Sequence, residues 1–188
     1  MHVGGPCSPI VKVGDRVLRG QLIAEPSGLG ANIHASYTGE VTAVTETDIV
    51  IKADDEQNFD EYVKIPDTKT NLEAIAAAGV VGAGGAGFPT AVKLKTEIPQ
   101  GCFIANCAEC EPLLAHNIHQ IETDAAQLVR GVKYAMEITK APKGYIAIKP
   151  KHKKAVIELI KACRNEDNID VFRLPDMYPA GDERVIVR

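Results

Sequence analysis

Tyr145-Ile146-Ala147-Ile148 is a short apolar run that predicts a buried β-strand. Apolar residues then recur at helical spacing over Val156–Ile160, and Ile169–Phe172 predicts a further strand. Upstream, Cys102–Ala105 predicts a strand, and the apolar positions between Ile121 and Met136 predict a helix. Strands that alternate with helices of this length predict a parallel sheet covered by helices, in which ligands bind beyond the carboxyl ends of the strands.

The first 60 residues show a different pattern. Short runs of Val, Ile and Thr are separated by turn residues, which predicts a compact all-β module. The predicted strands are Val11–Val13, Gln21–Ala24, Asn32–Ala35, Glu40–Val44 and Asp48–Ile51. Pro66-Asp67 then reads as a linker, so we expect one domain over residues 1–65 and a second over residues 66–188.

A short helix is expected directly after the linker. Thr70-Asn71-Leu72-Glu73 fits a capping box, in which the Thr hydroxyl and the Glu carboxylate satisfy amides of the first turn. Gly79 is suited to end this helix because glycine adopts the left-handed conformation readily.

The composition excludes several classes of protein. The chain has 188 residues, of which 45% are hydrophobic and 24% charged, and a net charge of −4, which does not favour nucleic-acid binding. No apolar run of 18 residues and no signal peptide are present, so no membrane insertion is expected. Five scattered cysteines predict free thiols in a reducing cytoplasm.

The segment Val81–Thr90 carries four glycines within six residues, at positions 82, 84, 85 and 87. Their backbone amides can approach a phosphate or a ring closely, and a helix beginning near Pro89 would add its positive end. Lys93 lies one turn into that helix. The spacing differs from both standard phosphate-binding glycine patterns. The alternative is a flexible loop between two helices.

A second polar motif, Asn106-Cys107-Ala108-Glu109-Cys110-Glu111-Pro112, directly follows the first predicted strand of the sheet. Its amide and two carboxylates could bind the N–H groups of a heterocycle or a ribose, or the glutamates could simply favour a helix N-terminus. Cys102, Cys107 and Cys110, with Cys163, have a spacing that some iron–sulfur proteins use. We expect no metal site, because Cys102 falls inside a strand predicted to be buried.

Two further segments carry polar groups. Tyr178-Pro179-Ala180-Gly181-Asp182-Glu183 follows the third predicted strand and is either a ligand-binding element or an ordinary loop. The basic run of Lys149, Lys151, His152, Lys153 and Lys154 predicts a solvated face, with docking of an acidic electron-transfer partner as the alternative.

Together these motifs resemble the flavoprotein subunit of respiratory complex I, and more closely the C subunit of the Rnf ion-pumping complex. An electron-transfer protein tied to D-proline reductase and the cobalamin reductase of propanediol-utilising microcompartments share the fold. The resemblance implies FMN-binding roles for Gly82, Gly84, Gly85, Lys93, Asn106, Glu109, Tyr178, Gly181 and Asp182. It implies NADH-binding roles for Phe88, Glu111 and Glu183. The resemblance departs at Ala108, where complex I relatives have Asp, and this departure puts one flavin hydrogen bond in question.

The first module resembles the barrel-sandwich hybrid of biotinyl and lipoyl carriers, on Val13–Val17, Gly20–Ile23 and Ile33–Ala35. Carriers place their modified lysine where this chain has Gly28. The module is therefore expected to be an unmodified structural accessory. The predicted fold class is α/β, with this all-β module followed by a Rossmann-like FMN-binding domain with a parallel sheet.

The resemblance implies transfer of a hydride from NADH to FMN, with no side chain as a catalytic acid or base. Electrons would pass to [4Fe–4S] clusters in a C-terminal region that this sequence lacks, so the chain is expected to be truncated. The implied partners are other electron-transfer subunits or a reductase, with a cytoplasmic location that includes the periphery of a membrane complex. The alternative is a docking or scaffold subunit that keeps the fold without flavin.

Overall fold

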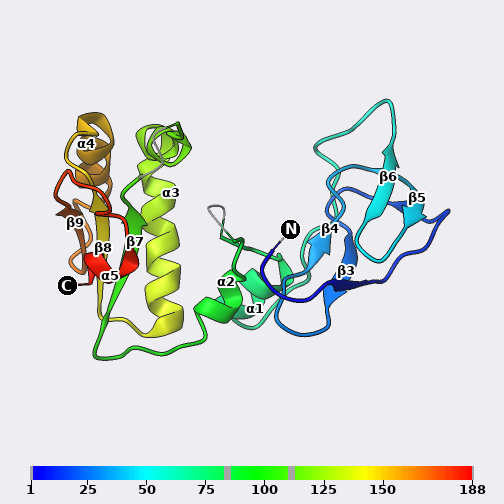
Figure 1. The fold of residues 1–188 in the computed structure, drawn as a ribbon, viewed down its shortest axis with the longest axis horizontal. Coiled ribbons are helices and arrows are strands. Elements are labelled where there is room, and N and C mark those ends of the chain that lie inside the picture. Colours follow the sequence, from blue (N-terminus) through cyan, green and yellow to red (C-terminus); the bar gives the residue numbers. More distant parts are fainter. Residues whose placement is uncertain (1, 83–85, 110–112, 188) are drawn as a thin grey trace. The chain divides into compact units, whose positions relative to one another are not determined.

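The computed structural model describes residues 2–82, 86–109 and 113–187, and the chain forms two compact units, Met1–Lys95 and Thr96–Arg188 (Figure 1). Each unit has a hydrophobic core of its own. The domain boundary at residue 65, which was drawn from composition alone, stays a prediction. No helix among the described residues combines the length and the apolarity that crossing a membrane requires.

The first unit begins with two small antiparallel sheets, as expected for a barrel-sandwich hybrid. Their strands are β1 (Cys7–Pro9), β2 (Arg16–Val17), β3 (Leu22–Pro26), β4 (Ile33–His34), β5 (Gly39–Val44) and β6 (Ile49–Ala53). The strand orders are β1-β3-β4 and β2-β5-β6. Val17, Ile23, Ala35 and Val41 form the buried core between them.

The strand predicted over residues 11–13 is wrong, and β1 and β2 were missed. In this region the backbone turns: Asp15 Oδ2 accepts a hydrogen bond from Lys12 N at 2.9 Å, and Gly14 N donates to Val41 O at 2.8 Å. The apolar residues at 11 and 13 therefore do not alternate across a ladder. β2 is only two residues long, which is too short for a periodicity to reveal.

The Thr70 half of the capping box and the helix stop after the linker are confirmed. Helix α1 (Asn71–Ala77) begins with Thr70, whose hydroxyl accepts a hydrogen bond from Glu73 N at 3.2 Å. The Glu73 carboxylate differs from the prediction, because it accepts a hydrogen bond from Lys69 N at 2.9 Å, one residue before the N-cap. Gly79 has φ +65°, and a Cβ there would lie 2.1 Å from the carbonyl oxygen of Asn32. Both the conformation and the close approach require glycine.

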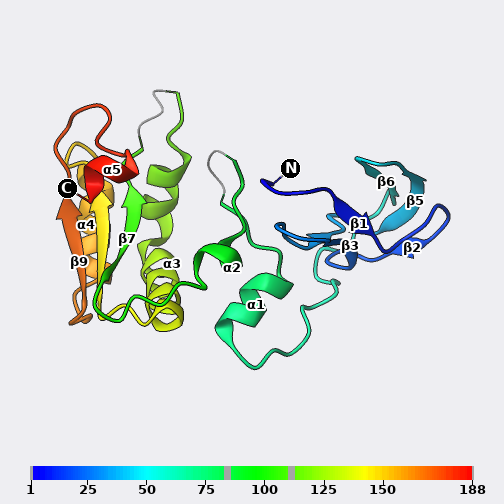
Figure 2. The ribbon, with the colours of Figure 1, turned by 60° about the horizontal axis from the view of Figure 1, so that its bottom comes forward.

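The second unit contains the predicted parallel sheet, in the order β7-β8-β9. Its strands are β7 (Cys102–Cys107), β8 (Lys143–Ile148) and β9 (Ile169–Arg173). Its helices are α3 (His116–Thr139), α4 (Lys153–Ala162) and α5 (Glu183–Ile186). Figure 2 shows α5 near the ends of the strands, apart from α3 and α4. Within α3, Asp124 has non-helical backbone angles and accepts a hydrogen bond from Gln127 N at 3.0 Å.

The two faces of this sheet are packed differently. On the helix-covered face, large side chains such as Ile146, Ile148 and Leu159 form one core with α3 and α4. On the other face, a separate buried cluster consists of Ala108, Ala147, Leu174 and Ala180, with Ile104 and Ile186 beside it. We call this second surface the alanine face.

Candidate functional site

The second and third motifs meet at the carboxyl edge of the sheet, where the second follows β7 and the third follows β9. Cys107 pairs with Ile148, so the residues that follow β7 and β8 start from adjacent positions. Asn106 Nδ2 donates to Gly181 O at 2.9 Å, and Asn106 Oδ1 accepts from Ala108 N at 3.1 Å. A single amide side chain therefore ties a strand end to a loop 75 residues away in the sequence.

The last two residues of the third motif, Asp182 and Glu183, form the start of α5. The Asp182 carboxylate caps this helix by accepting a hydrogen bond from Arg184 N at 2.9 Å. Tyr178 is 82% exposed, and Glu183 is exposed. Asp182 is therefore engaged in local structure, whereas Tyr178 and Glu183 present their side chains to the surroundings.

Glu109 holds the feature that points most directly to a ligand. Its Oε2 atom is inaccessible to solvent and has no hydrogen-bond partner among the described residues. A buried acceptor without a partner costs roughly 1–3 kcal/mol. Polar atoms in this condition are rare in folded proteins and call for a partner such as an ion or a ligand. The N–H group of a heterocycle would supply what Oε2 lacks.

The loop after β8 contains a residue whose role the sequence did not reveal. The basic run was interpreted as a solvated face, and this is wrong for Lys149, which is only 5% exposed. His152 Nε2 is also inaccessible and without a partner in the described part of the chain. Burial lowers the pKa of His152, and the neighbouring Lys151 lowers it further.

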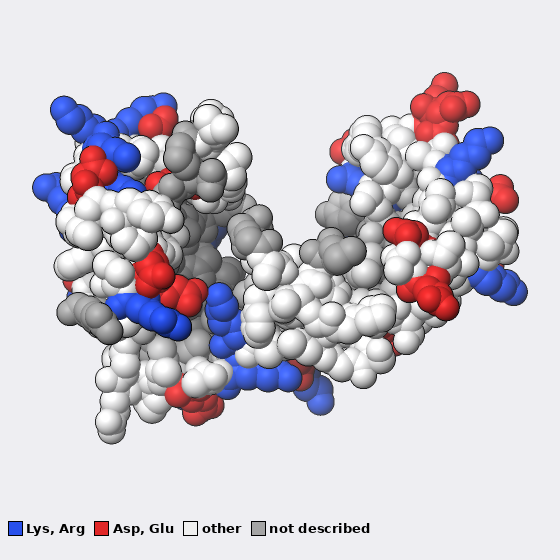
Figure 3. Space-filling view, in the orientation of Figure 1, with Lys and Arg blue, Asp and Glu red and all other residues white. Residues whose placement is uncertain are grey.

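Other lysines of the run do lie on the surface. Lys151 pairs with Asp176 at 3.4 Å, and Lys154 pairs with Glu122 at 3.2 Å. In Figure 3, Lys and Arg side chains gather at the upper left, where Figure 1 shows α4. The one signal that could have separated Lys149 from them is its place directly after the alternating residues of β8.

The glycine segment belongs to the first unit and is closed by backbone pairing. Gly82 N donates to Phe88 O at 2.9 Å, and Thr90 N donates to Val80 O at 2.9 Å. Gly87 has φ +65°, which favours glycine. Helix α2 (Thr90–Lys93) has only four residues, so the charge at its positive end is small. Lys93 and Phe88 are both exposed.

The predicted site residues are thus divided between the two units. Asn106, Glu109, Tyr178, Gly181, Asp182 and Glu183 belong to the second unit, and Gly82, Phe88 and Lys93 to the first. Gly84, Gly85 and Glu111 lie outside the described residues, as does Cys110.

Cys102 was expected to be buried, and this prediction is wrong. Cys102 is exposed at the start of β7, because the buried part of this strand begins after it. Cys107 is buried, and burial raises the pKa of its thiol to about 12. Within residues 2–82, 86–109 and 113–187, no three His, Cys, Asp or Glu side chains are grouped as metal ligands would be.

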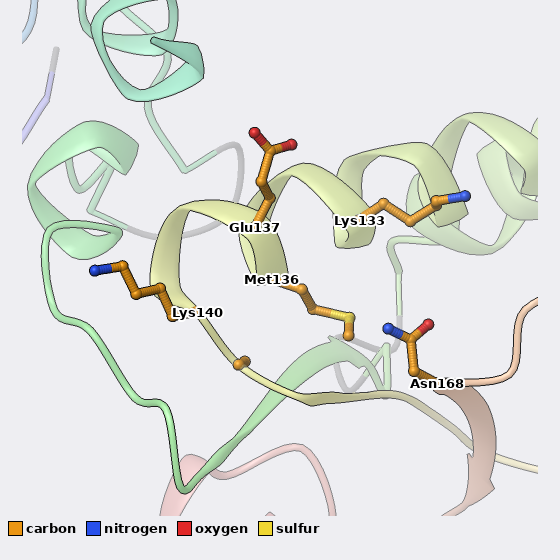
Figure 4. A pocket seen from close by; sticks show the side chains of 6 residues that line it. Lys133, Met136, Glu137, Lys140 and Asn168 are labelled. Atoms are coloured by element: carbon orange, nitrogen blue, oxygen red, sulfur yellow. The ribbon is translucent and has the colours of Figure 1, made fainter.

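A separate pocket of about 390 Å³ lies at the opposite, amino edge of the sheet (Figure 4). Its lining residues are Lys133, Met136, Glu137, Lys140, Ala141 and Asn168. Both lysines are committed to ion pairs, with Glu166 and Glu97. Because ligands of parallel sheets bind at the carboxyl edge, this pocket is not the predicted site.

Comparison with known proteins assigns both parts of the chain. Residues 75–188 match the family described as the Nuo51 FMN-binding domain. The chain belongs to this family. Residues 1–61 match the RnfC barrel-sandwich hybrid domain, so the Nuo51-type domain is combined with an RnfC-type first module, as predicted.

Several curated relatives share this arrangement. The chain is 37% identical to the C subunit of the Na⁺-translocating ferredoxin:NAD⁺ oxidoreductase complex of Acetobacterium woodii, over 100% of this chain and 46% of the relative. It is 34% identical to the C subunit of the proton-translocating complex of Clostridium ljungdahlii, over 99% and 44%. It is 50% identical to the cobalamin reductase PduS of Salmonella typhimurium, over 59% and 24%. The chain thus spans less than half the length of these relatives.

Proposed function

We propose that this chain is part of an electron-transfer flavoprotein, which binds FMN and accepts electrons from NADH. The observation that carries the proposal is the buried, unpartnered Oε2 of Glu109 at the carboxyl edge of the sheet. The match of residues 75–188 to an FMN-binding domain supports it.

The described residues fit a flavin in their donors and acceptors. Glu109 would accept a hydrogen bond from a ring N–H. Asn106 donates one N–H of its amide to Gly181 O at 2.9 Å, which fixes the third motif beside the strand end. The second N–H of the same amide would donate to the flavin. Exposed Tyr178 and Glu183 would contact the ligand from that motif, and we assign Glu183, with Phe88, to the nicotinamide side.

The glycine segment would contribute backbone donors. Gly82 N is already engaged with Phe88 O, and Gly84 and Gly85, which we propose as the backbone donors, lie outside the described residues. Exposed Lys93 would add a positive charge beside the phosphate. When bound, FMN supplies the chemistry by accepting a hydride, so the protein provides position and charge rather than an acid or a base.

The longer protein would pass these electrons onward. Its relatives are named as subunits of ion-translocating oxidoreductase complexes or as cobalamin reductases. We propose [4Fe–4S] clusters in the region that relatives have beyond this chain. We also propose a cytoplasmic position at the periphery of a membrane complex, with other subunits or a reductase as partners.

One observation favours a second candidate, a docking subunit without flavin. Ala108 stands where complex I relatives carry Asp, and it is 1% exposed within the packed alanine face. Its methyl group packs in this cluster and cannot form a hydrogen bond to a flavin ring. In this candidate the fold would be retained for contacts with other subunits only.

A visible absorption spectrum separates the two candidates. The purified chain is mixed with FMN, passed through a desalting column, and measured before and after anaerobic addition of NADH. The proposal predicts retained flavin bands near equimolar amounts, bleached by NADH. Passage of all FMN through the column, with a folded protein by circular dichroism, would favour the docking subunit.

A further inference from the structure

His152 is the second residue at the carboxyl edge of the sheet with an enclosed atom that lacks a partner. Its Nε2 atom and Glu109 Oε2 are both inaccessible to solvent, and neither has a hydrogen-bond partner among the described residues. Such atoms are rare in folded proteins, because each gives up a hydrogen bond that water supplies in the unfolded chain. The proposed function uses only Glu109, so the enclosed nitrogen of His152 still calls for an explanation.

The strand register brings these two residues to neighbouring positions. Cys107 pairs with Ile148, so β7 and β8 end side by side. Glu109 comes two residues after the end of β7, and His152 comes four residues after the end of β8. The backbone after β8 turns at once, because His152 N donates to Lys149 O at 3.3 Å. His152 therefore stays close to the end of its own strand, next to the residues that follow β7.

The charges around His152 agree with this placement. Burial lowers its pKa most, followed by the charge of Lys151; Asp176 then raises the pKa, Lys149 lowers it and Glu109 raises it. Near pH 7 the imidazole is therefore mainly neutral and carries a single N–H group. A hydrogen bond between Nε2 and Oε2 would leave neither atom without a partner, so the two groups are near each other but not bonded. A third group between them would satisfy both.

The side chain of His152 does not serve the helix that it precedes. His152 is the N-cap residue of α4, but its imidazole makes no capping hydrogen bond. Only its backbone takes part, because Val156 N donates to His152 O at 3.0 Å, and any residue could supply that carbonyl. The flanking Lys151 and Lys153 are exposed. An enclosed imidazole nitrogen that neither caps the helix nor pairs with a neighbour fits a ligand contact.

The chemistry of a flavin ring matches the two unsatisfied atoms. One edge of the isoalloxazine ring carries an N–H group flanked by two carbonyl oxygens. If Glu109 accepts from this N–H group, the group beside it is a carbonyl oxygen, which needs a donor. We propose that His152 is a further flavin-binding residue, which donates from Nε2 to this carbonyl oxygen while Glu109 accepts from the ring N–H. The pair recognises the ring and not the phosphate group, and this inference rests on the proposed function.

Two substitutions of His152 separate its donor from its bulk. His152→Leu removes the donor, and His152→Gln keeps an N–H group in a side chain of similar length. His152→Leu should fold, because the nitrogen that it removes has no partner in the described part of the chain. We expect it to weaken the binding of FMN and of riboflavin about tenfold, and His152→Gln to regain most of this loss.

Fluorescence titrations measure these affinities. His119→Leu is the matched control, because His119 is an exposed histidine of the same unit, and it should leave both affinities within about twofold. Similar losses for FMN and riboflavin are expected, because riboflavin has the same ring without the phosphate. A loss for FMN with riboflavin binding unchanged would place His152 at the phosphate and overturn the inference.

A direct readout follows the imidazole itself. In ¹⁵N NMR spectra of the chain labelled at histidine, the ring signal that disappears in His152→Leu belongs to His152. Adding FMN should shift this signal and leave that of His119 in place, which a purely structural role for His152 would not produce. An unmoved signal with FMN bound, or unchanged flavin affinities in His152→Leu, would overturn the inference and leave the proposed function standing. If the unmodified chain binds no FMN, the proposed function fails and the inference with it.

Discussion

The two faces of the β7-β8-β9 sheet are built from the same strands but serve different ends. The helix-covered face is filled by large aliphatic side chains such as Ile146, Ile148 and Leu159, and its polar groups are few. The alanine face is filled by methyl groups and carries Asn106 near its carboxyl edge. Large side chains bury more apolar area and supply more stability per residue. The difference teaches that the helix-covered face supplies most of the apolar burial, whereas the smaller alanine face holds the third motif beside the end of β7.

The largest effect on stability is expected from truncating a buried side chain of the helix-covered face. Leu159 is fully buried on α4, so Leu159→Ala should lower the free energy of unfolding by about 2–5 kcal/mol. Ile160→Ala is the matched control, because Ile160 is its neighbour on the same helix and is 47% exposed; its loss should be well under half as large. Urea denaturation measures both. Equal losses would break the contrast between the faces.

A larger side chain on the alanine face should lower stability less than Leu159→Ala does, but it should weaken FMN binding more. Ala147 is 1% exposed, so Ala147→Leu should destabilise by about 1–3 kcal/mol through overpacking. It should also weaken FMN binding, since the added carbons would push the third motif away from Asn106. Phe172→Leu, in register with Ala147 but half-exposed, is the control. The contrast is refuted if FMN titrations give the same dissociation constant for all three proteins.

A pH effect should distinguish the buried thiol of the helix-covered face. Burial raises the pKa of Cys107 to about 12, so the folded state holds this proton more tightly than the unfolded state. The contribution is fully present below the unfolded pKa of about 8.5 and is lost as pH rises toward 12. Above pH 9 it should fall by about 1 kcal/mol per pH unit. Subtracting the pH profile of Cys107→Ala should isolate this slope, and parallel profiles would argue against it.

The smallest effect is expected where α5 begins near the alanine face. Asp182→Ala removes the cap on Arg184 N and should destabilise by about 1 kcal/mol. Asp182→Asn keeps an acceptor and should lose less. Hydrogen exchange of the first amides of α5 would report the change directly. If the Ala and Asn variants exchange alike, the carboxylate is not acting as the cap.

How far the sequence predicted these features depends on the range of the interactions. Periodicity located β7, β8, β9 and the helices between them, and local chemistry located the cap at Thr70 and the stop at Gly79. The error at residues 11–13 arose because Lys12 pairs locally with Asp15, through Lys12 N to Asp15 Oδ2 and Asp15 N to Lys12 O, so the backbone turns instead of joining a ladder.

The site was predicted less completely, for the same reason. The motifs named Asn106 and Gly181 separately, but their hydrogen bond spans 75 residues and appears only in the fold. Lys149 stood in a run of basic residues, and only the fold shows that it is buried. A run of charged residues predicts a solvent-exposed surface, but it does not reveal that one member of the run is buried.

The central claim is that the carboxyl edge of the sheet binds flavin through Glu109. FMN fluorescence titration of Glu109→Gln tests it most directly, with Glu166→Gln as the control, because Glu166 pairs with Lys133 beside the pocket at the amino edge. The account predicts that Glu109→Gln weakens FMN binding about tenfold or more, while Glu166→Gln leaves it within about twofold. Equal affinities for the unmodified chain and Glu109→Gln would contradict it.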